Sequence, residues 1–230
     1  MEVLSGWWDD FFWGSVVVLK VFLASLVLMV IFGLMGAAAK LSNNRIAQKV
    51  AGAYTVIFRG TPEILVILLL YFGSAIALTA IAQLFNPDIK FVDVPPFWAG
   101  TIAIALIVGS YATETFRGAF LGVQPGSVEA AYALGMGAIQ TFFYVRVPEM
   151  WRLALPAFGN HMLSLIKDTA LISIIGLNET LFVAKQAIGT TGKPFTMYIV
   201  VGLIYLGFST VITLTVMGLE RYGHRHMVTK

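Results

Sequence analysis

Five long apolar runs dominate this 230-residue sequence and restrict the folds open to it. They cover residues 16–39, 54–82, 96–120, 153–177 and 195–219. An α-helix crosses the hydrocarbon core of a bilayer with about 20 mostly apolar residues, and every run is long enough to do so. A membrane β-barrel would instead show shorter segments of alternating polarity, and none is visible. We therefore predict an all-α integral membrane protein with five transmembrane helices.

The composition agrees with a membrane location. Hydrophobic residues make up 58% of the chain and charged residues 12%, which is too apolar for an ordinary soluble domain of this size to cover with a wettable surface. We find no linker and no internal repeat in residues 1–230, so we predict a single domain. Many secondary carriers are built from repeated halves, so the lack of a repeat disfavours that class. Because five helices rarely enclose a pathway alone, we expect the chain to oligomerise.

The distribution of Lys and Arg predicts the orientation in the membrane. Most of the basic residues lie in three segments: the connection after the first run, the end of the third run with the connection that follows it, and the C-terminal tail. They are Lys40, Arg45, Lys49, Arg117, Arg146, Arg152, Arg221, Arg225 and Lys230. Residues 1–15, 83–95 and 178–194 together hold only Lys90, Lys185 and Lys193. By the positive-inside rule, the N-terminus faces outward and the C-terminus faces the cytoplasm, as an odd number of helices requires. Topology thus explains the net charge of +3, and we predict no nucleic-acid partner.

The sequence offers no groups for bond chemistry. Cysteine is absent, which excludes disulfides, iron–sulfur ligation and thiolate zinc sites. The three histidines, His161, His224 and His226, form no credible metal-binding cluster. No Gly-x-x-x-x-Gly-Lys-Ser/Thr phosphate loop occurs, so ATP must be hydrolysed by a separate subunit if it drives this protein. We predict no catalytic residue, no metal site and no cofactor bound by this chain.

Residues 121–152 form the longest interruption between apolar runs, and their pattern predicts an ordered loop with helices of its own. Pro125-Gly126-Ser127 indicates a turn and a helix start, with Ser127 as a candidate cap. Gly135 and Gly137 interrupt that helix after about two turns. A second short apolar stretch, residues 142–145, ends at Pro148. We predict two short helices in an L shape.

The same loop resembles the cytoplasmic coupling loop of ABC importer permeases. The pattern of that family is Glu-Ala-Ala, three residues, Gly, nine residues, then Ile-x-Leu-Pro. This chain has Glu129-Ala130-Ala131, Gly135 and Val145-x-Val147-Pro148, with two valines as the aliphatic residues at unchanged spacing. The resemblance implies that the loop docks into a groove on a cytoplasmic ATPase. The coupling residues would be Glu129, Ala130, Ala131, Gly135, Val145 and Pro148. Alternatively, the loop is an amphipathic segment that rests on the membrane and leaves Glu129 solvated.

The resemblance covers nearly the whole chain. Arg59-Gly60-Thr61-Pro62-Glu63 is similar to a motif of polar amino acid permeases, and the acid after proline resembles the subgroup for histidine, arginine and opines. Residues 111–119, 154–160, 167–171 and 194–196 are likewise similar to that subgroup. The resemblance implies the Q-type subunit of such a system, with a type I ABC importer permease fold, in a bacterial inner membrane.

Three kinds of partner follow from this resemblance. A dimer of ATP-binding cassette ATPases would hold the ATP and Mg²⁺. A second permease subunit, more readily a paralogue than an identical copy, would complete the pore. A periplasmic binding protein would deliver the amino acid or opine, because the outer loops are too small to capture it.

Charged residues at membrane depth are costly and usually functional or paired, and Lys20, Glu63, Lys167 and Asp168 are predicted to lie there. Asn160, Ser164 and Asp168 recur at every fourth residue, which aligns them along one face of a helix. A carboxylate on that face would suit the ammonium or guanidinium group of a cationic amino acid, and the two neutral groups would orient it. The alternative is that Asp168 pairs with Lys20 or with a base on a partner, within a polar helix seam.

Gly60 and Pro62 suggest a locally broken helix whose freed backbone groups line a cavity, flanked by Thr61 and Glu63. The predicted substrate residues are therefore Asp168, Asn160, Ser164, Thr61 and Glu63. The motif is equally compatible with a structural bend at which Arg59 extends to the inner headgroups.

Two further patterns predict packing. Glu114 and Arg117 are expected to form an ion pair one turn apart. The glycines at 33, 36, 202 and 207 indicate close approach of helices.

Three competing functions stay open at this point. An importer for acidic or neutral amino acids would keep the architecture. An ATP-independent channel or secondary carrier leaves the spacing of the coupling loop unexplained. A membrane enzyme would need a cluster of catalytic residues that the sequence does not show.

Overall fold

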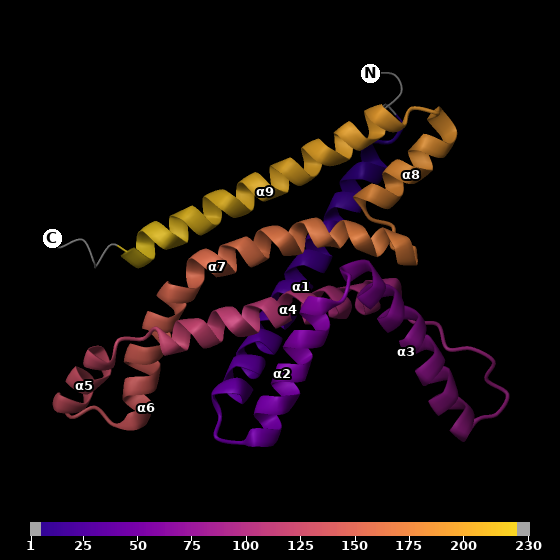
Figure 1. Ribbon diagram of the computed structural model, residues 1–230. Coiled ribbons are helices and arrows are strands. Elements are labelled where there is room, and N and C mark those ends of the chain that lie inside the picture. Colours follow the sequence, from indigo (N-terminus) through magenta and orange to yellow (C-terminus); the bar gives the residue numbers. More distant parts are fainter. Residues whose placement is uncertain (1–5, 225–230) are drawn as a thin grey trace.

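The structure is a computed structural model that describes residues 6–224, and the regular elements over this range are all helical (Figure 1). In chain order they are α1 (Trp8–Leu41), α2 (Arg45–Gly60), α3 (Glu63–Phe85), α4 (Pro96–Leu121), α5 (Pro125–Ala133), α6 (Ala138–Thr141), the π-helix η2 (Phe142–Arg146), α7 (Val147–Asp168), the 3₁₀-helix η3 (Thr169–Ile175), α8 (Thr180–Thr191) and α9 (Pro194–His224). The prediction of an all-α chain is confirmed. Arg225, His226 and Lys230 lie outside the described residues.

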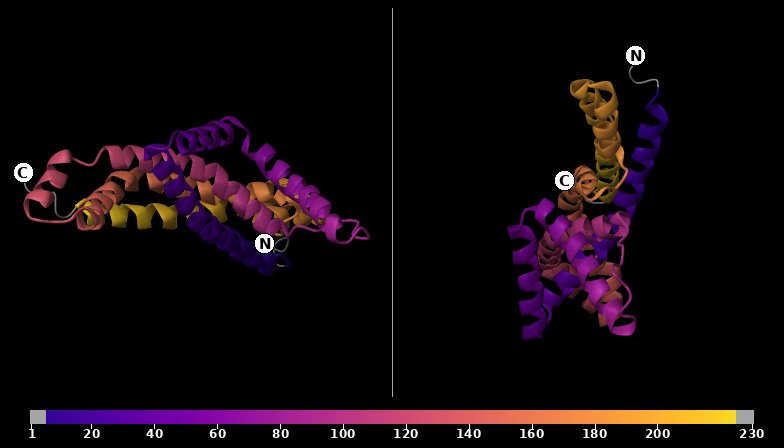
Figure 2. Two further views of the ribbon diagram at one scale, coloured as in Figure 1. Left: turned by 90° about the horizontal axis from the view of Figure 1, so that it is seen from below. Right: turned by 90° about the vertical axis from the view of Figure 1, so that its right-hand side faces the viewer.

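Four helices, α1, α3, α4 and α9, are long and apolar enough to cross a bilayer. A fifth span arises if residues 138–175 and α8, which are bent by 50° at a short break, count as one. The predicted five helices are the upper end of this range. The short helices α5 and α6 lie at one end of the molecule, and the α3–α4 connection lies at the opposite end (Figures 1 and 2).

The apolar run 54–82 is not one helix, as the sequence had suggested. It contains the second half of α2 and most of α3, which are separated at Thr61 and Pro62. Proline lacks a backbone N–H and disfavours helical backbone in the residue before it, and Thr61 is accordingly extended, with φ −106° and ψ 138°. At its other end α2 begins at Arg45 and is capped by Asn44, whose side chain accepts hydrogen bonds from the N–H groups of Ile46 and Ala47. The predicted break next to Gly60 is confirmed.

The sequence places a turn-rich connection at residues 189–194, but helix α8 (Thr180–Thr191) extends into this stretch. Its start is fixed by Glu179, whose carboxylate accepts the N–H groups of Leu181 (2.8 Å) and Phe182 (2.9 Å). The predicted turn begins only at Gly192, where φ is +64°. The error arose because the glycine and threonines at the end of α8 resemble a loop composition.

Helix α4 is the centre of the packing. In its apolar 18-residue stretch 67% of the residues are buried, compared with 17% for α3 and 22% for α9. It packs most extensively on α1. A Cβ atom at Gly33 would lie 2.9 Å from the Phe116 ring, and one at Gly36 would lie 2.3 Å from Thr113 Oγ1, so both glycines permit this approach. For Gly202 and Gly207 the prediction of close packing is wrong within the described chain, since neither has a neighbour within 4 Å of such an atom.

Candidate functional site

The coupling loop begins with a helix whose first turn is hydrogen-bonded to a residue distant in the sequence. Helix α5 starts after Gln124 with Pro125 in its first turn, and its cap is Gln124 rather than the predicted Ser127. The backbone N–H of Gln124 donates to Glu149 Oε1 of α7 at 3.0 Å. Because an acidic group near a helix start is stabilising, Glu149 fixes the start of α5 to α7. The sequence did not point to Glu149, which lies 25 residues away.

The end of α5 is set by Gly135, as its position in the motif had suggested. Its φ is +82°, a conformation that favours glycine, and a Cβ atom there would meet nothing within 4 Å. The next backbone N–H, of Met136, returns to the carbonyl of Ala131 at 3.1 Å. The demand for glycine at this position is therefore conformational and not steric.

The second part of the loop differs from the prediction. Helix α6 continues through η2 into α7, so Pro148 lies in the first turn of α7 and does not end a separate short helix. Proline is tolerated there because a first-turn N–H needs no helical partner. The two short helices are therefore α5 and the α6–η2 segment, which are joined by residues 134–137.

The predicted coupling residues lie together on this end of the molecule but differ in exposure. Glu129, Ala130, Gly135 and Pro148 are exposed, Val145 is half-buried and Ala131 is buried. The most exposed apolar side chains of the loop are ones that the sequence motif does not contain: Leu134 (83%), Ile139 (76%) and Tyr144 (73%). Exposed apolar side chains grouped outside the long apolar helices are typical of a protein contact surface.

A pair of acidic side chains lies at the junction of α3 and α7. Glu63 is the first residue of α3, Asp168 is the last residue of α7, and their carboxyl groups lie close enough for their charges to interact. Both side chains are half-buried. We call Glu63 and Asp168 the acidic pair. The sequence singled out each residue, and the structure brings them together.

The other predicted substrate residues contribute unequally around the acidic pair. Asn160 and Ser164 lie on α7 with Asp168, and both are exposed. The hydroxyl of Thr61 donates to the carbonyl of Ile57 at 2.8 Å, so its proton is used within α2. Lys20 is exposed, and no ion pair joins it to Asp168 in the part of the chain that the structure describes.

The predicted ion pair between Glu114 and Arg117 is confirmed, with Glu114 Oε2 and Arg117 Nη2 2.9 Å apart. Lys40 of α1 pairs with the other oxygen of Glu114, and it also donates to Thr55 Oγ1 of α2 at 2.7 Å. The cluster thus ties α1, α2 and α4 together. His161 contacts Thr115 Oγ1 at 2.8 Å through Nε2, in agreement with a packing role. Within residues 6–224 no group of three or more potential ligands could hold a metal ion.

Several proteins of known role are similar to this chain. It is 42% identical to the histidine/lysine/arginine/ornithine transport system permease protein HisQ of Salmonella typhimurium. The similarity extends over 208 residues, which are 90% of each chain. It is 38% identical to the octopine transport system permease protein OccQ of Rhizobium radiobacter, over 88% of this chain and 85% of that one. It is 37% identical to the nopaline transport system permease protein NocQ of Agrobacterium fabrum, over 96% and 94%.

Solved structures agree with this similarity. A crystal structure of an amino acid ABC transporter with histidines matches with a TM-score of 0.79 and 28% identity, over 95% of this chain and 96% of that one. An inward-facing structure of the MetNI methionine ABC transporter shares the fold alone, with a TM-score of 0.74 and 18% identity over 96% and 99%. The family model described as binding-protein-dependent transport system inner membrane component matches residues 29–221. The chain belongs to this family of ABC importer permeases.

Proposed function

We propose that this permease carries a cationic amino acid or an opine inward across the bacterial inner membrane, with the acidic pair as the main contact for the cationic group. The observation that carries the proposal is the approach of Glu63 and Asp168 without a basic partner from another helix in residues 6–224. Two carboxylates side by side repel each other, so the site favours a ligand that brings positive charge. The names of the relatives HisQ, OccQ and NocQ support the same substrate class.

The chemistry of the acidic pair suits an ammonium or a guanidinium group. Hydrogen bonds between such a cation and a carboxylate are about twice as strong as neutral ones, and a guanidinium group can engage two oxygens at once. Lys167 is adjacent to Asp168 and partly offsets its charge, but successive helical residues point about 100° apart, and the two form no ion pair within residues 6–224. Asn160 and Ser164, which share a helix face with Asp168, would orient the uncharged parts of the substrate.

The coupling end would transmit ATP-driven movement to this site. We assign Glu129, Ala130, Ala131, Gly135, Val145 and Pro148 to the contact with the ATPase, and we add the exposed Leu134, Ile139 and Tyr144. Helix α7 begins at this loop and ends at Asp168, so one helix joins the two regions. A displacement of the loop would therefore move the substrate face directly.

The proposed topology has five spans, an outer N-terminus and a cytoplasmic C-terminus, with residues 1–230 forming one domain. It is supported by the distribution of basic residues and by the bent α7–α8 pair as the fifth span. The proposed assembly pairs this chain with a paralogous permease, an ATPase dimer and a periplasmic binding protein. The exposed, apolar surfaces of α3 and α9 leave room for lipid and for a partner.

The test is ATP-dependent uptake by proteoliposomes that contain the whole complex and its binding protein. Arginine, histidine, ornithine, octopine, nopaline and glutamate would be compared as substrates. We expect uptake of cationic and guanidino compounds and none of glutamate. Preference for glutamate would retain the importer and overturn the role of the acidic pair, whereas uptake without ATP would indicate a channel or a secondary carrier.

A further inference from the structure

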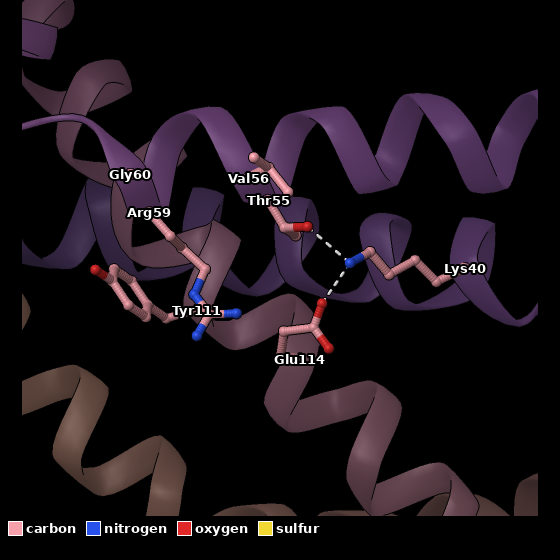
Figure 3. Close-up of a pocket in the computed structure, with 7 residues that line it drawn as sticks. All are labelled: Lys40, Thr55, Val56, Arg59, Gly60, Tyr111 and Glu114. Carbon is pink, nitrogen blue, oxygen red and sulfur yellow. Dashed lines mark hydrogen bonds and ion pairs between the residues drawn. The ribbon is translucent and has the colours of Figure 1, made fainter.

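A second charged region lies between α1, α2 and α4, and substrate transport as proposed does not use it. A hollow of about 520 Å³ is lined by Lys40, Arg59, Tyr111 and Glu114, among others (Figure 3). A hollow of about 420 Å³ beside it shares Lys40 and Glu114 and adds Arg117. We call these five residues and the two hollows the inner cationic groove.

The charges of the inner cationic groove do not balance. It contains three cationic side chains and one carboxylate. Both oxygens of that carboxylate are used, because Glu114 accepts from Lys40 and from Arg117. Within residues 6–224 no carboxylate pairs with Arg59. The groove therefore carries an excess positive charge, which favours an anionic ligand.

Arg59 is held in place by an aromatic ring and not by an acid. Its guanidinium carbon lies 5.2 Å from the centre of the Tyr111 ring, within the range of a cation–π contact (Figure 3). Such a contact fixes the position of the planar group and leaves its N–H donors free along the edges. A guanidinium group presented in this way matches the oxygens of a phosphate.

The depth of the groove agrees with the inner headgroup region, if the orientation under Proposed function holds. Trp13 is exposed near the outer end of α1, as is typical of the membrane interface. The helical rise places Lys40 about 40 Å along the axis from Trp13, which is the thickness of a bilayer with its headgroup regions. Val56 lines the hollow and is 73% exposed, and its neighbour Ile57 is 58% exposed. The groove therefore has apolar surface beside its charges.

We propose that the inner cationic groove binds the phosphate headgroup of an anionic phospholipid from the inner leaflet. Basic pockets between transmembrane helices on the cytoplasmic side are suited to such headgroups. Arg59 would contact the phosphate, and the side chains of Val56 and Ile57 would contact the acyl chains. A bound lipid would brace the end of α2, which lies three residues before Glu63 of the acidic pair.

The experiment is native mass spectrometry of the purified whole complex with phosphatidylglycerol or phosphatidylcholine added in equal amounts. We expect the wild-type complex to retain phosphatidylglycerol under activation that strips phosphatidylcholine. Arg59→Gln removes the unpaired cation and is expected to reduce this retention about tenfold, whereas Arg59→Lys keeps the charge and much of the retention. Lys49→Gln is the matched control, since Lys49 is an exposed cation on the same helix and lines neither hollow.

Equal retention of the two lipids by the wild type, or equal losses in Arg59→Gln and Lys49→Gln, would overturn the proposal. Displacement of the lipid by excess inorganic phosphate would assign the groove to a small anion instead. Failure to recover lipid on the wild-type complex, with Arg59 cross-linking to the second permease, would assign it to a subunit contact. Uptake measured in parallel separates the two proposals, because transport without lipid preference refutes only this one.

Discussion

The acidic pair and the ion pairs around Glu114 lie on connected helices, and their charges are arranged in opposite ways. Glu114 is matched by Lys40 and Arg117, and Lys40 also binds Thr55, so that three helices are joined. In the acidic pair, the charges of Glu63 and Asp168 act on each other, and no basic side chain from another helix pairs with them in the described chain. The comparison suggests that matched charges hold the helices together, and that unmatched charges mark the places where ligands bind.

The largest effect is expected from a substitution that removes one charge of the acidic pair. Asp168→Asn removes a charged acceptor that the cationic substrate needs, and charged hydrogen bonds contribute about 1.5–3 kcal/mol, so arginine uptake should fall about 10- to 100-fold. Initial rates of ATP-dependent uptake in proteoliposomes measure this loss. Asp93→Asn is the matched control, since Asp93 is exposed in the connection between α3 and α4. Equal rates for Asp168→Asn and wild type would favour a structural role for Asp168.

The second largest effect is expected from a substitution that removes the carboxylate of Glu114 from its two ion pairs. Glu114→Gln leaves Lys40 and Arg117 without their carboxylate, and only 17% of the Lys40 side chain is exposed. We expect the free energy of unfolding to fall by about 1–2 kcal/mol, as measured by SDS titration in mixed micelles. The double variant Lys40→Met/Glu114→Gln should recover part of the loss, because it leaves no uncompensated ammonium group. A double variant no more stable than Glu114→Gln would contradict this account.

The smallest effect has the opposite sign. Glu63→Gln relieves the repulsion between two carboxylates, so the same titration should show a gain in unfolding free energy of about 0.5 kcal/mol. Uptake should decrease in the same variant, because the substrate loses one acceptor charge. A loss of stability would mean that Glu63 is matched by a group that the described residues do not contain, and the comparison would have to be revised.

The sequence predicted the local features of this molecule well. The end of the first short helix at Gly135 was predictable, because glycine acts there through backbone geometry that is set within a few residues. The pair Glu114–Arg117 was predictable for the same reason, as residues one helical turn apart meet. The break at Pro62 was also predictable. Hydropathy nevertheless predicts one helix over residues 54–82, because it is insensitive to a change in the direction of the backbone.

Features that join distant segments were not predictable. Glu63 and Asp168 were each singled out as costly charges, yet nothing in a single sequence indicates that the start of α3 meets the end of α7. The same holds for Lys40 with Glu114 and for the contact of Glu149 with Gln124. The extent of α8 was missed because the carboxylate of Glu179 starts it, and capping by glutamate is a weak signal in a sequence.

The most direct test of the acidic pair is the binding of arginine and citrulline to the purified complex in nanodiscs, without the binding protein. The two ligands have nearly the same shape, but the urea group of citrulline is neutral. We predict that the wild-type complex binds arginine at least about tenfold more tightly, and that Glu63→Gln/Asp168→Asn binds both equally. An unchanged preference for arginine in the double variant would contradict the assignment of the acidic pair as the substrate contact.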